Sequence, residues 1–186
     1  GDYNKIDEAE AIRMLRHAID HGVNYVDTAY GYHGGNSEIV VGKALQDGYR
    51  GKVKLATKLP VWHVKEHADF DRLLNEQLGK LQAETIDVYL LHSLGAESWH
   101  KVRDLGVIKW AEGALADGRI GHLGFSFHDD NPAFTEIVDA YDAWSMCQVQ
   151  YNYMDIENQA GTKGVEYAAS KGLAVVVMEG LLGGKL

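Results

Sequence analysis

The feature that most constrains the fold is a regular recurrence of β-rich segments along the chain. Such segments begin near residues 23, 53, 86, 120, 146 and 173, so successive starts lie 26 to 34 residues apart. Each interval has room for one strand and one helix. Six consecutive strands with a helix between each pair predict parallel pairing with right-handed crossovers.

Helical periodicity fills the intervals between these strands. Residues 9–19 carry apolar side chains at i, i+3, i+4 and i+7 spacing, and Gly22 follows as a stop. Asn131 precedes Pro132 and is expected to cap the helix that begins there. The other helices are expected over residues 37–45, 70–81, 98–116 with an interruption near Gly106, 132–143 and 161–171.

Two architectures share this alternation: an open doubly wound sheet and a (β/α)8 barrel. In an open sheet the ligand binds where the strand order reverses, so only a few strand ends carry chemistry. Here all six strands end in or beside a polar residue, namely Asp27, Lys58, His92, Ser126, Gln150 and Glu179. A barrel builds its site from strand ends that converge at one mouth, and no GxGxxG motif follows any strand. We therefore predict an α/β protein with the TIM-barrel fold.

The number of strands indicates an incomplete barrel. A barrel of this type has eight strands in about 250 residues, whereas this chain of 186 residues supplies six. The chain begins where the first helix is expected and stops after the seventh strand. We expect strands two to seven to be present, the first and eighth strands to be missing, and residues 1–186 to form a single barrel domain that is a fragment.

Charge and composition narrow the classes of partner. The formal charge is −9 and no basic run is present, so we expect no nucleic-acid partner. Cys147 is the single cysteine, which excludes a disulfide framework and a CxxC metal site. No apolar run reaches the roughly 18 residues of a membrane helix, and no signal peptide opens the chain. We expect a cytoplasmic protein that binds no metal and no membrane.

The segment 23–32 changes abruptly from a strand to an ionisable cluster. Val23, Tyr25 and Val26 suit a buried strand, and Asp27 then places a carboxylate where the apolar run should continue. Five residues later, Tyr32 offers a phenol that a glycine-containing loop could bring back over that carboxylate. A buried charge needs a partner, so later strand ends are expected to supply one.

Five short segments resemble the signatures of the aldo-keto reductases, in the same order and at similar spacing. They are 27–32, 56–58, 90–92, 124–126 and 148–152. The resemblance implies a (β/α)8 barrel and reversible hydride transfer between NADPH, or less often NADH, and the carbonyl group of a small molecule. It also implies a catalytic tetrad of Asp, Tyr, Lys and His, which falls here on Asp27, Tyr32, Lys58 and His92.

The chemistry of hydride transfer agrees with this tetrad. Negative charge develops on the carbonyl oxygen, so a proton donor must lie against it. A phenol with a pKa of about 10 is a poor acid until a nearby cation favours its anion. Lys58 would supply that cation, Asp27 would hold the buried ammonium, and His92 would orient the carbonyl oxygen or share protons with Tyr32.

The resemblance also assigns cofactor-binding residues. Ser126 and Gln150 would hold the nicotinamide carboxamide, and Met178 stands where the family usually has an aromatic residue stacked on the nicotinamide ring. A polarizable thioether can pack against a flat ring, although less specifically. Glu179 would face the pyrophosphate. His128 occupies a position where the family often has Asn.

Other interpretations of the same residues remain open. The strand-end Asp and Lys could form a structural ion pair, and His92 could be a hydrogen-bonded core residue. A Schiff-base aldolase would use Lys58 as a nucleophile, which requires a neutral and unpaired amine. A non-catalytic barrel could bind the nucleotide as a sensor or regulatory subunit.

Two further sets of residues are less informative. The segments 91–94 and 178–186 resemble a microbial branch of the family in which a ferredoxin-like iron–sulfur extension follows the barrel, and no ligands for such a cluster occur in this sequence. Trp62 and Trp99 are expected in loops after strand ends, where they could line a substrate pocket or only pack the loops.

Overall fold

The computed structural model describes residues 5–186. Its six-stranded sheet is parallel throughout, and each strand pairs with the next one in the chain, in the order β1-β2-β3-β4-β5-β6. The strands are β1 (Tyr25–Asp27), β2 (Lys54–Leu59), β3 (Ile86–Leu94), β4 (Ile120–Phe127), β5 (Met146–Gln150) and β6 (Ala174–Met178). The strand order never reverses, which excludes the doubly wound arrangement and agrees with a barrel.

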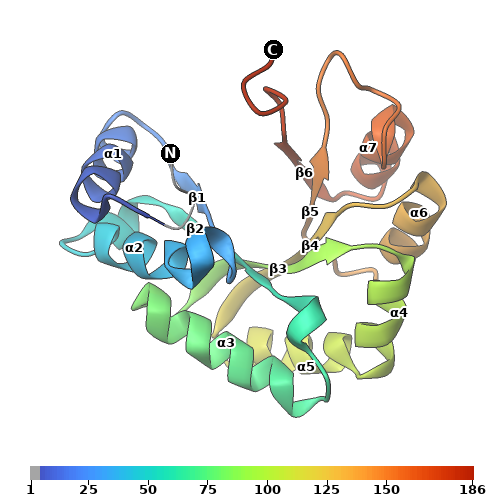
Figure 1. Cartoon of the computed structure of the whole chain (residues 1–186). Helices are drawn as coiled ribbons and strands as arrows, with labels where there is room; N and C mark the ends of the chain where they lie inside the picture. Colours follow the sequence, from blue (N-terminus) through green and yellow to red (C-terminus); the bar gives the residue numbers. More distant parts are fainter. Residues whose placement is uncertain (1–4) are drawn as a thin grey trace.

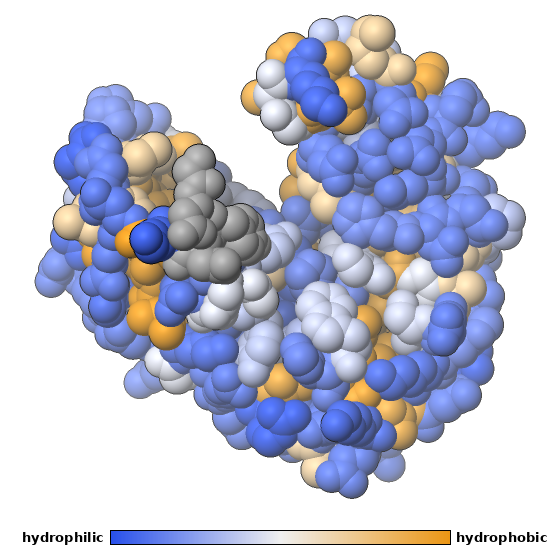
Figure 2. Space-filling model, viewed as in Figure 1, coloured by the Kyte–Doolittle hydropathy of each residue, from blue (hydrophilic) through white to orange (hydrophobic). Residues whose placement is uncertain are grey.

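The helices cover the outer face of the curled sheet (Figure 1). They are α1 (Glu8–Asp20), α2 (Ser37–Ala44), α3 (Ala68–Leu81), α4 (Ala96–Asp104), α5 (Val107–Ala116), α6 (Asn131–Asp139) and α7 (Gly161–Ser170), with 3-10 turns η1 (Tyr32–Gly35), η2 (Tyr49–Lys52) and η3 (Val61–His63). β1 and β6 form the two open edges of the sheet, so the described chain is a curled half-barrel. Figure 2 shows its open side as a deep hollow.

Strand alternation divides the core into two parts. On β2, Leu55 and Leu59 belong to the large cluster between the sheet and the helices, whereas Ala56 lies in a small cluster with Val88, Leu90 and Met146. That small cluster lies on the concave face, the interior of the curled sheet. Side chains two residues further along the same strands therefore point into the mouth of the curl.

The predicted elements agree with the structure to within about two residues at most strand starts, with three corrections. β1 spans only Tyr25–Asp27 instead of residues 23–29, and α6 ends at Asp139 instead of Ala143. The N-cap of α6 is Asp130, whose side chain accepts a hydrogen bond from the Ala133 amide, so the predicted cap at Asn131 is wrong. The interruption near Gly106 is confirmed, because this glycine has φ 84° and separates α4 from α5.

None of the helices between residues 5 and 186 has the length and apolar character required to cross a bilayer.

Candidate active site

Lys58 is the centre of the polar cluster at the carboxyl ends of the strands. Its side chain is 2% exposed, and its Nζ donates to both carboxylate oxygens of Asp27 and to the Thr28 carbonyl, each at 2.8 Å. An ammonium has three N–H donors, so these acceptors match its full capacity. Burial lowers the pKa of Lys58 below its ordinary value, and the Asp27 carboxylate partly offsets that effect.

Tyr32 and His92 lie beside this ion pair. The Tyr32 ring centroid is 5.2 Å from the Lys58 Nζ, and the Tyr32 and His92 rings meet edge to face at 5.9 Å between centroids. Tyr32 is 38% exposed and opens η1 in the loop after β1, whereas His92 comes from β3. All four predicted tetrad residues are therefore brought together from three consecutive strands and one loop.

His92 is held as a neutral imidazole. Burial, followed by electrostatic repulsion from Lys58 and His128, lowers its pKa to about 3. Its Nδ1 atom is buried and has no hydrogen-bond partner within residues 5–186. A neutral imidazole has one N–H donor and one acceptor, so His92 can orient a polar group without adding charge beside Lys58.

Gln148 is a site residue that the sequence analysis missed. Its Nε2 donates to Asp27 Oδ2 at 3.2 Å, and its buried Oε1 has no partner in the described part of the chain. Gln148 and Gln150 lie two positions apart on β5 and share the concave face. The alternation of side chains along β5 therefore makes both glutamines candidates for the site, and it does not show which of them contacts a ligand.

The predicted cofactor-binding residues lie on the opposite side of the mouth. The Ser126 hydroxyl accepts from the Ser93 amide at 2.7 Å. Gln150 pairs with Met178 across β5 and β6, and its side chain bonds to Asp155 and Asn158 in the following loop. Met178 is half-buried, and Glu179 is exposed.

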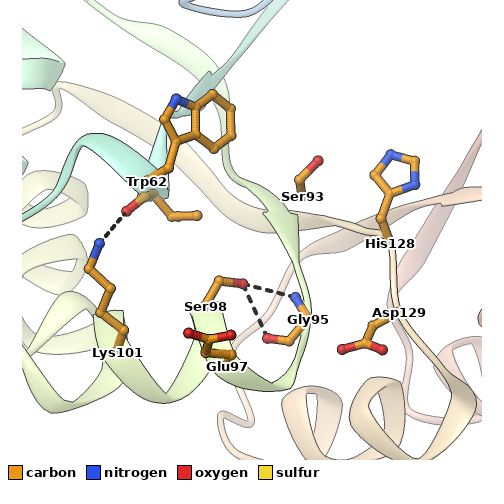
Figure 3. A pocket seen from close by; sticks show the side chains of 9 residues that line it. Trp62, Ser93, Gly95, Glu97, Ser98, Lys101, His128 and Asp129 are labelled. Atoms are coloured by element: carbon orange, nitrogen blue, oxygen red, sulfur yellow. Dashed lines mark hydrogen bonds between the residues drawn. The ribbon is translucent and has the colours of Figure 1, made fainter.

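A pocket of about 530 Å³ adjoins the tetrad (Figure 3). Trp62 forms one wall and also contacts His92, with 5.0 Å between their ring centroids. The other walls come from the ends of β3 and β4 and from α4, and they combine apolar surface with polar side chains, including Ser93, Ser98, Lys101, His128 and Asp129. The expected loop position of Trp99 is wrong: this residue lies in α4 and is 1% exposed.

The sheet is parallel and curled, its helices lie outside, and an ion pair, a phenol and an imidazole lie at the carboxyl ends of its strands. These features define an α/β-barrel class of protein. Sequence comparison then gives the family. The model of the aldo/keto reductase family matches residues 1–186, and the chain belongs to that family.

Individual relatives agree with this assignment. Aldo-keto reductase YhdN of Bacillus subtilis is 39% identical over 94 residues, which cover 46% of this chain and 28% of that protein. Methylglyoxal reductase YeaE of Escherichia coli is 29% identical over 167 residues, covering 84% of this chain and 50% of that protein. A crystal structure of an aldo/keto reductase from Klebsiella pneumoniae in complex with NADP and acetate aligns with a TM-score of 0.79 and 26% identity, covering 97% of this chain and 62% of that one. The chain thus spans about half the length of such relatives.

Proposed function

We propose that the protein transfers a hydride between a nicotinamide cofactor and a small carbonyl or alcohol substrate, with Tyr32 as the proton donor. The observation that carries this proposal is the buried Lys58 ammonium, saturated by Asp27 and Thr28 and 5.2 Å from the Tyr32 ring. A fixed cation beside a phenol is what makes that phenol acidic enough to protonate an oxygen.

The half-barrel is proposed to be one part of a (β/α)8 domain. The family membership and the consecutive strand order support assigning β1 to β6 as barrel strands two to seven. Residues 1–186 then form a single domain with the strands contributed by the rest of the barrel.

Each tetrad residue has a distinct task in the proposed reaction. Tyr32 gives its proton to the carbonyl oxygen, and Lys58 stabilises the phenolate that remains. Asp27 keeps the ammonium charged and in place, since an isolated buried ammonium would lose its proton. His92, neutral at physiological pH, donates a hydrogen bond that orients the carbonyl.

The chemistry of the concave face fits a nicotinamide carboxamide. The unpartnered Gln148 Oε1 can accept from the amide, and the Ser126 hydroxyl keeps its own proton for donation after accepting from Ser93. Gln150, Met178 and Glu179 remain proposed contacts. When bound, the reduced nicotinamide supplies the hydride. NADPH is the proposed cofactor, with NADH as the alternative, and the NADP complex of the Klebsiella relative supports this choice.

The pocket beside Trp62 is the proposed place for the rest of the substrate. Its walls offer hydroxyl, carboxylate, ammonium and imidazole groups as well as one indole face. Several of these groups already have partners: Lys101 Nζ donates to the Val61 carbonyl, Ser98 bonds to Gly95, and Asp129 accepts from the Ala96 amide. A small carbonyl compound with both polar and apolar surface fits such walls better than a long alkyl chain. The name of the methylglyoxal reductase relative is consistent with a small polar substrate.

The contacts of Lys58 argue against the aldolase alternative. A nucleophilic amine needs a free lone pair, whereas all three N–H donors of a charged Lys58 have acceptors at 2.8 Å. Borohydride trapping of an adduct at Lys58 would favour the aldolase. A nucleotide-binding sensor would bind NADPH and oxidise none of it in the presence of aldehydes.

The test uses Tyr32→Phe in the full-length protein. NADPH and NADH binding, followed by fluorescence, should be retained, since the phenol hydroxyl is assigned to the substrate oxygen. Turnover of a small aldehyde, followed by cofactor absorbance, should fall by several orders of magnitude. Unchanged turnover would remove Tyr32 from its proposed role.

A further inference from the structure

A buried polar cluster lies on the convex face of the sheet, directly behind Lys58. Its centre is Glu38 in the first turn of α2, whose side chain is 0% exposed. Glu38 Oε1 accepts from the Thr57 hydroxyl and from Gln77 Nε2, each at 2.6 Å. Gln77 Nε2 also donates to the Lys58 carbonyl at 3.0 Å, and Gln77 Oε1 accepts from the Tyr89 hydroxyl at 2.6 Å. The proposed reaction makes no direct use of this cluster.

Two residues at the start of α2 form side-chain hydrogen bonds with the sequence neighbours of both members of the ion pair. Ser37 Oγ lies 2.8 Å from Thr28 Oγ1, and Thr28 directly follows Asp27. The neighbouring Glu38 bonds to Thr57, which directly precedes Lys58. α2 also begins just after η1, the turn that Tyr32 opens. Ser37 and Glu38 thus connect the loop that carries Tyr32 with the residues next to Asp27 and Lys58.

We propose that Glu38 is a positioning residue for this site: it fixes β2 at Lys58 through Thr57 and Gln77, and its negative charge raises the pH at which the Lys58–Tyr32 pair loses its proton. The inference rests on the proposed function only for the identity of that pair. A negative charge opposes the loss of a proton from an ammonium and from a phenol alike. Its effect on both groups therefore has the same sign.

The charges around Glu38 come from three elements. β2 contributes Lys58, and β3 contributes the buried Tyr89 hydroxyl. α3 contributes Lys80, whose Nζ is 3.9 Å from Glu38 Oε2, and Glu76, which pairs with Lys80 at 2.9 Å. Burial raises the pKa of Glu38, while its hydrogen bonds and Lys80 act in the opposite direction. At the alkaline pH where a phenol titrates, the carboxylate is ionised.

Glu38→Gln separates the charge from the hydrogen bonds. The glutamine carbonyl can keep both donors of Oε1, and its NH₂ group takes the position of Oε2, which accepts no hydrogen bond within residues 5–186. The readout is the ultraviolet titration of tyrosinate in cofactor-free, full-length protein, with the Tyr32 component obtained by subtracting the titration of Tyr32→Phe. The Tyr32 midpoint should move to lower pH by about half a unit. The alkaline limb of aldehyde reduction should move by the same amount.

Matched variants separate positioning from a purely structural role. Lys80→Met removes the opposite charge and should move the midpoint to higher pH. Asp87→Asn removes a carboxylate of β3 that accepts a hydrogen bond from the Leu55 amide at 3.0 Å. Leu55 lies on β2, three residues before Lys58. The Asp87→Asn variant should lower thermal stability and leave the Tyr32 midpoint unchanged.

A midpoint that stays at the wild-type value in folded Glu38→Gln overturns the inference. If that variant does not fold, Lys80→Met decides, and an unchanged midpoint there is equally decisive. Because the titration needs no turnover, it gives a result even if the proposed reaction is wrong. Undiminished turnover in Tyr32→Phe would overturn the reaction alone.

Discussion

The two halves of the mouth differ in which groups the chain itself pairs: the lysine side pairs its charges and leaves the neutral His92 Nδ1 without a partner in residues 5–186, whereas the glutamine side leaves an amide oxygen without one. On the lysine side, formed by Asp27, Tyr32, Lys58 and His92, the ammonium has three acceptors at 2.8 Å. On the glutamine side, formed by Ser126, Gln148, Gln150 and Met178, the Gln148 Oε1 is buried with no partner among residues 5–186. An unpaired buried acceptor is costly to keep unless a ligand uses it.

This difference indicates that the two sides of the mouth have different functions. The lysine side is assembled by contacts between neighbouring strands and by one hydrogen bond from Gln148 to Asp27, so its charges are fixed before any ligand binds. The glutamine side lies towards the open edge at β6, where Val177 is 49% exposed and Leu181 is 69% exposed. We infer that the lysine side controls proton transfer and that the glutamine side controls affinity for the cofactor.

The largest effect is expected from breaking the ion pair of the lysine side. Lys58→Met should lower turnover at least about a thousandfold, because the phenolate loses its cation. The variant should also lose up to about 3 kcal/mol of unfolding free energy, since Asp27, whose side chain is 25% exposed, keeps its charge with only the Gln148 amide left as a partner. Enzyme kinetics and urea unfolding measure the two effects.

The matched control for Lys58→Met is the double variant with Asp27→Asn. It should recover most of the lost stability and none of the turnover. Recovery of turnover would show that Lys58 acts only as a structural partner of Asp27.

The next effect tests the glutamine side. Gln148→Leu removes the unpaired acceptor and should weaken NADPH binding about tenfold, the value of one or two hydrogen bonds. Gln150→Leu is the comparison: its side chain already bonds to Asp155 and Asn158 in the chain itself, so a smaller loss of affinity is expected. Fluorescence titration measures both. A larger loss of affinity in Gln150→Leu would support the assignment made from the sequence and contradict the one made here for Gln148.

A smaller effect concerns the pH dependence of stability. The pKa of His92 is about 3 in the folded protein, below the ordinary value of about 6.5 expected when unfolded. The unfolded chain therefore binds the proton first as the pH falls, and stability is lost from about pH 6.5 towards pH 3. His92 contributes at most about 1.4 kcal/mol per pH unit to the dependence of the unfolding free energy on pH.

Urea unfolding of wild type and His92→Asn between pH 5 and 6.5 isolates the histidine from most carboxyl groups. The variant should show the flatter dependence. Equal slopes in wild type and His92→Asn would contradict the proposed neutral state of His92.

Much of this arrangement could be predicted from the sequence because it follows from local patterns. The strand starts depend on apolar periodicity, and the meeting of Asp27, Lys58 and His92 follows once the strands are parallel and consecutive. The choice between Gln148 and Gln150 depends on contacts with a loop, which a strand pattern does not contain. In the sequence, Glu38 is an acidic residue in the first turn of a helix. Its burial against Thr57 of β2 and Gln77 of α3 depends on how that helix packs.

Tight helix contacts of this kind leave little trace in the sequence. A Cβ atom on Gly42 would lie 2.6 Å from the Lys80 carbonyl, so α2 and α3 approach closely at that glycine. The expected loop position of Trp99 conflicts with the helix predicted over residues 98–116, which contains it. The structure places Trp99 on the buried side of α4, with its ring centroid 6.0 Å from that of Trp144.

The smallest effect tests a local anchor on the glutamine side, at the start of α6. Asp130→Ala removes the side chain that accepts from the Ala133 amide at 3.0 Å and should cost about 1 kcal/mol of unfolding free energy. Asn131→Ala instead removes a bond from its Nδ2 to the Ala160 carbonyl, which ties α6 to the residue before α7.

If Asp130 is the cap, its variant should speed amide exchange in the first turn of α6, whereas Asn131→Ala should speed exchange mainly near residue 160. Neither variant touches the lysine side, so turnover at saturating cofactor should stay at the wild-type value, and a fall in either would show that the two sides are less independent than their contacts indicate.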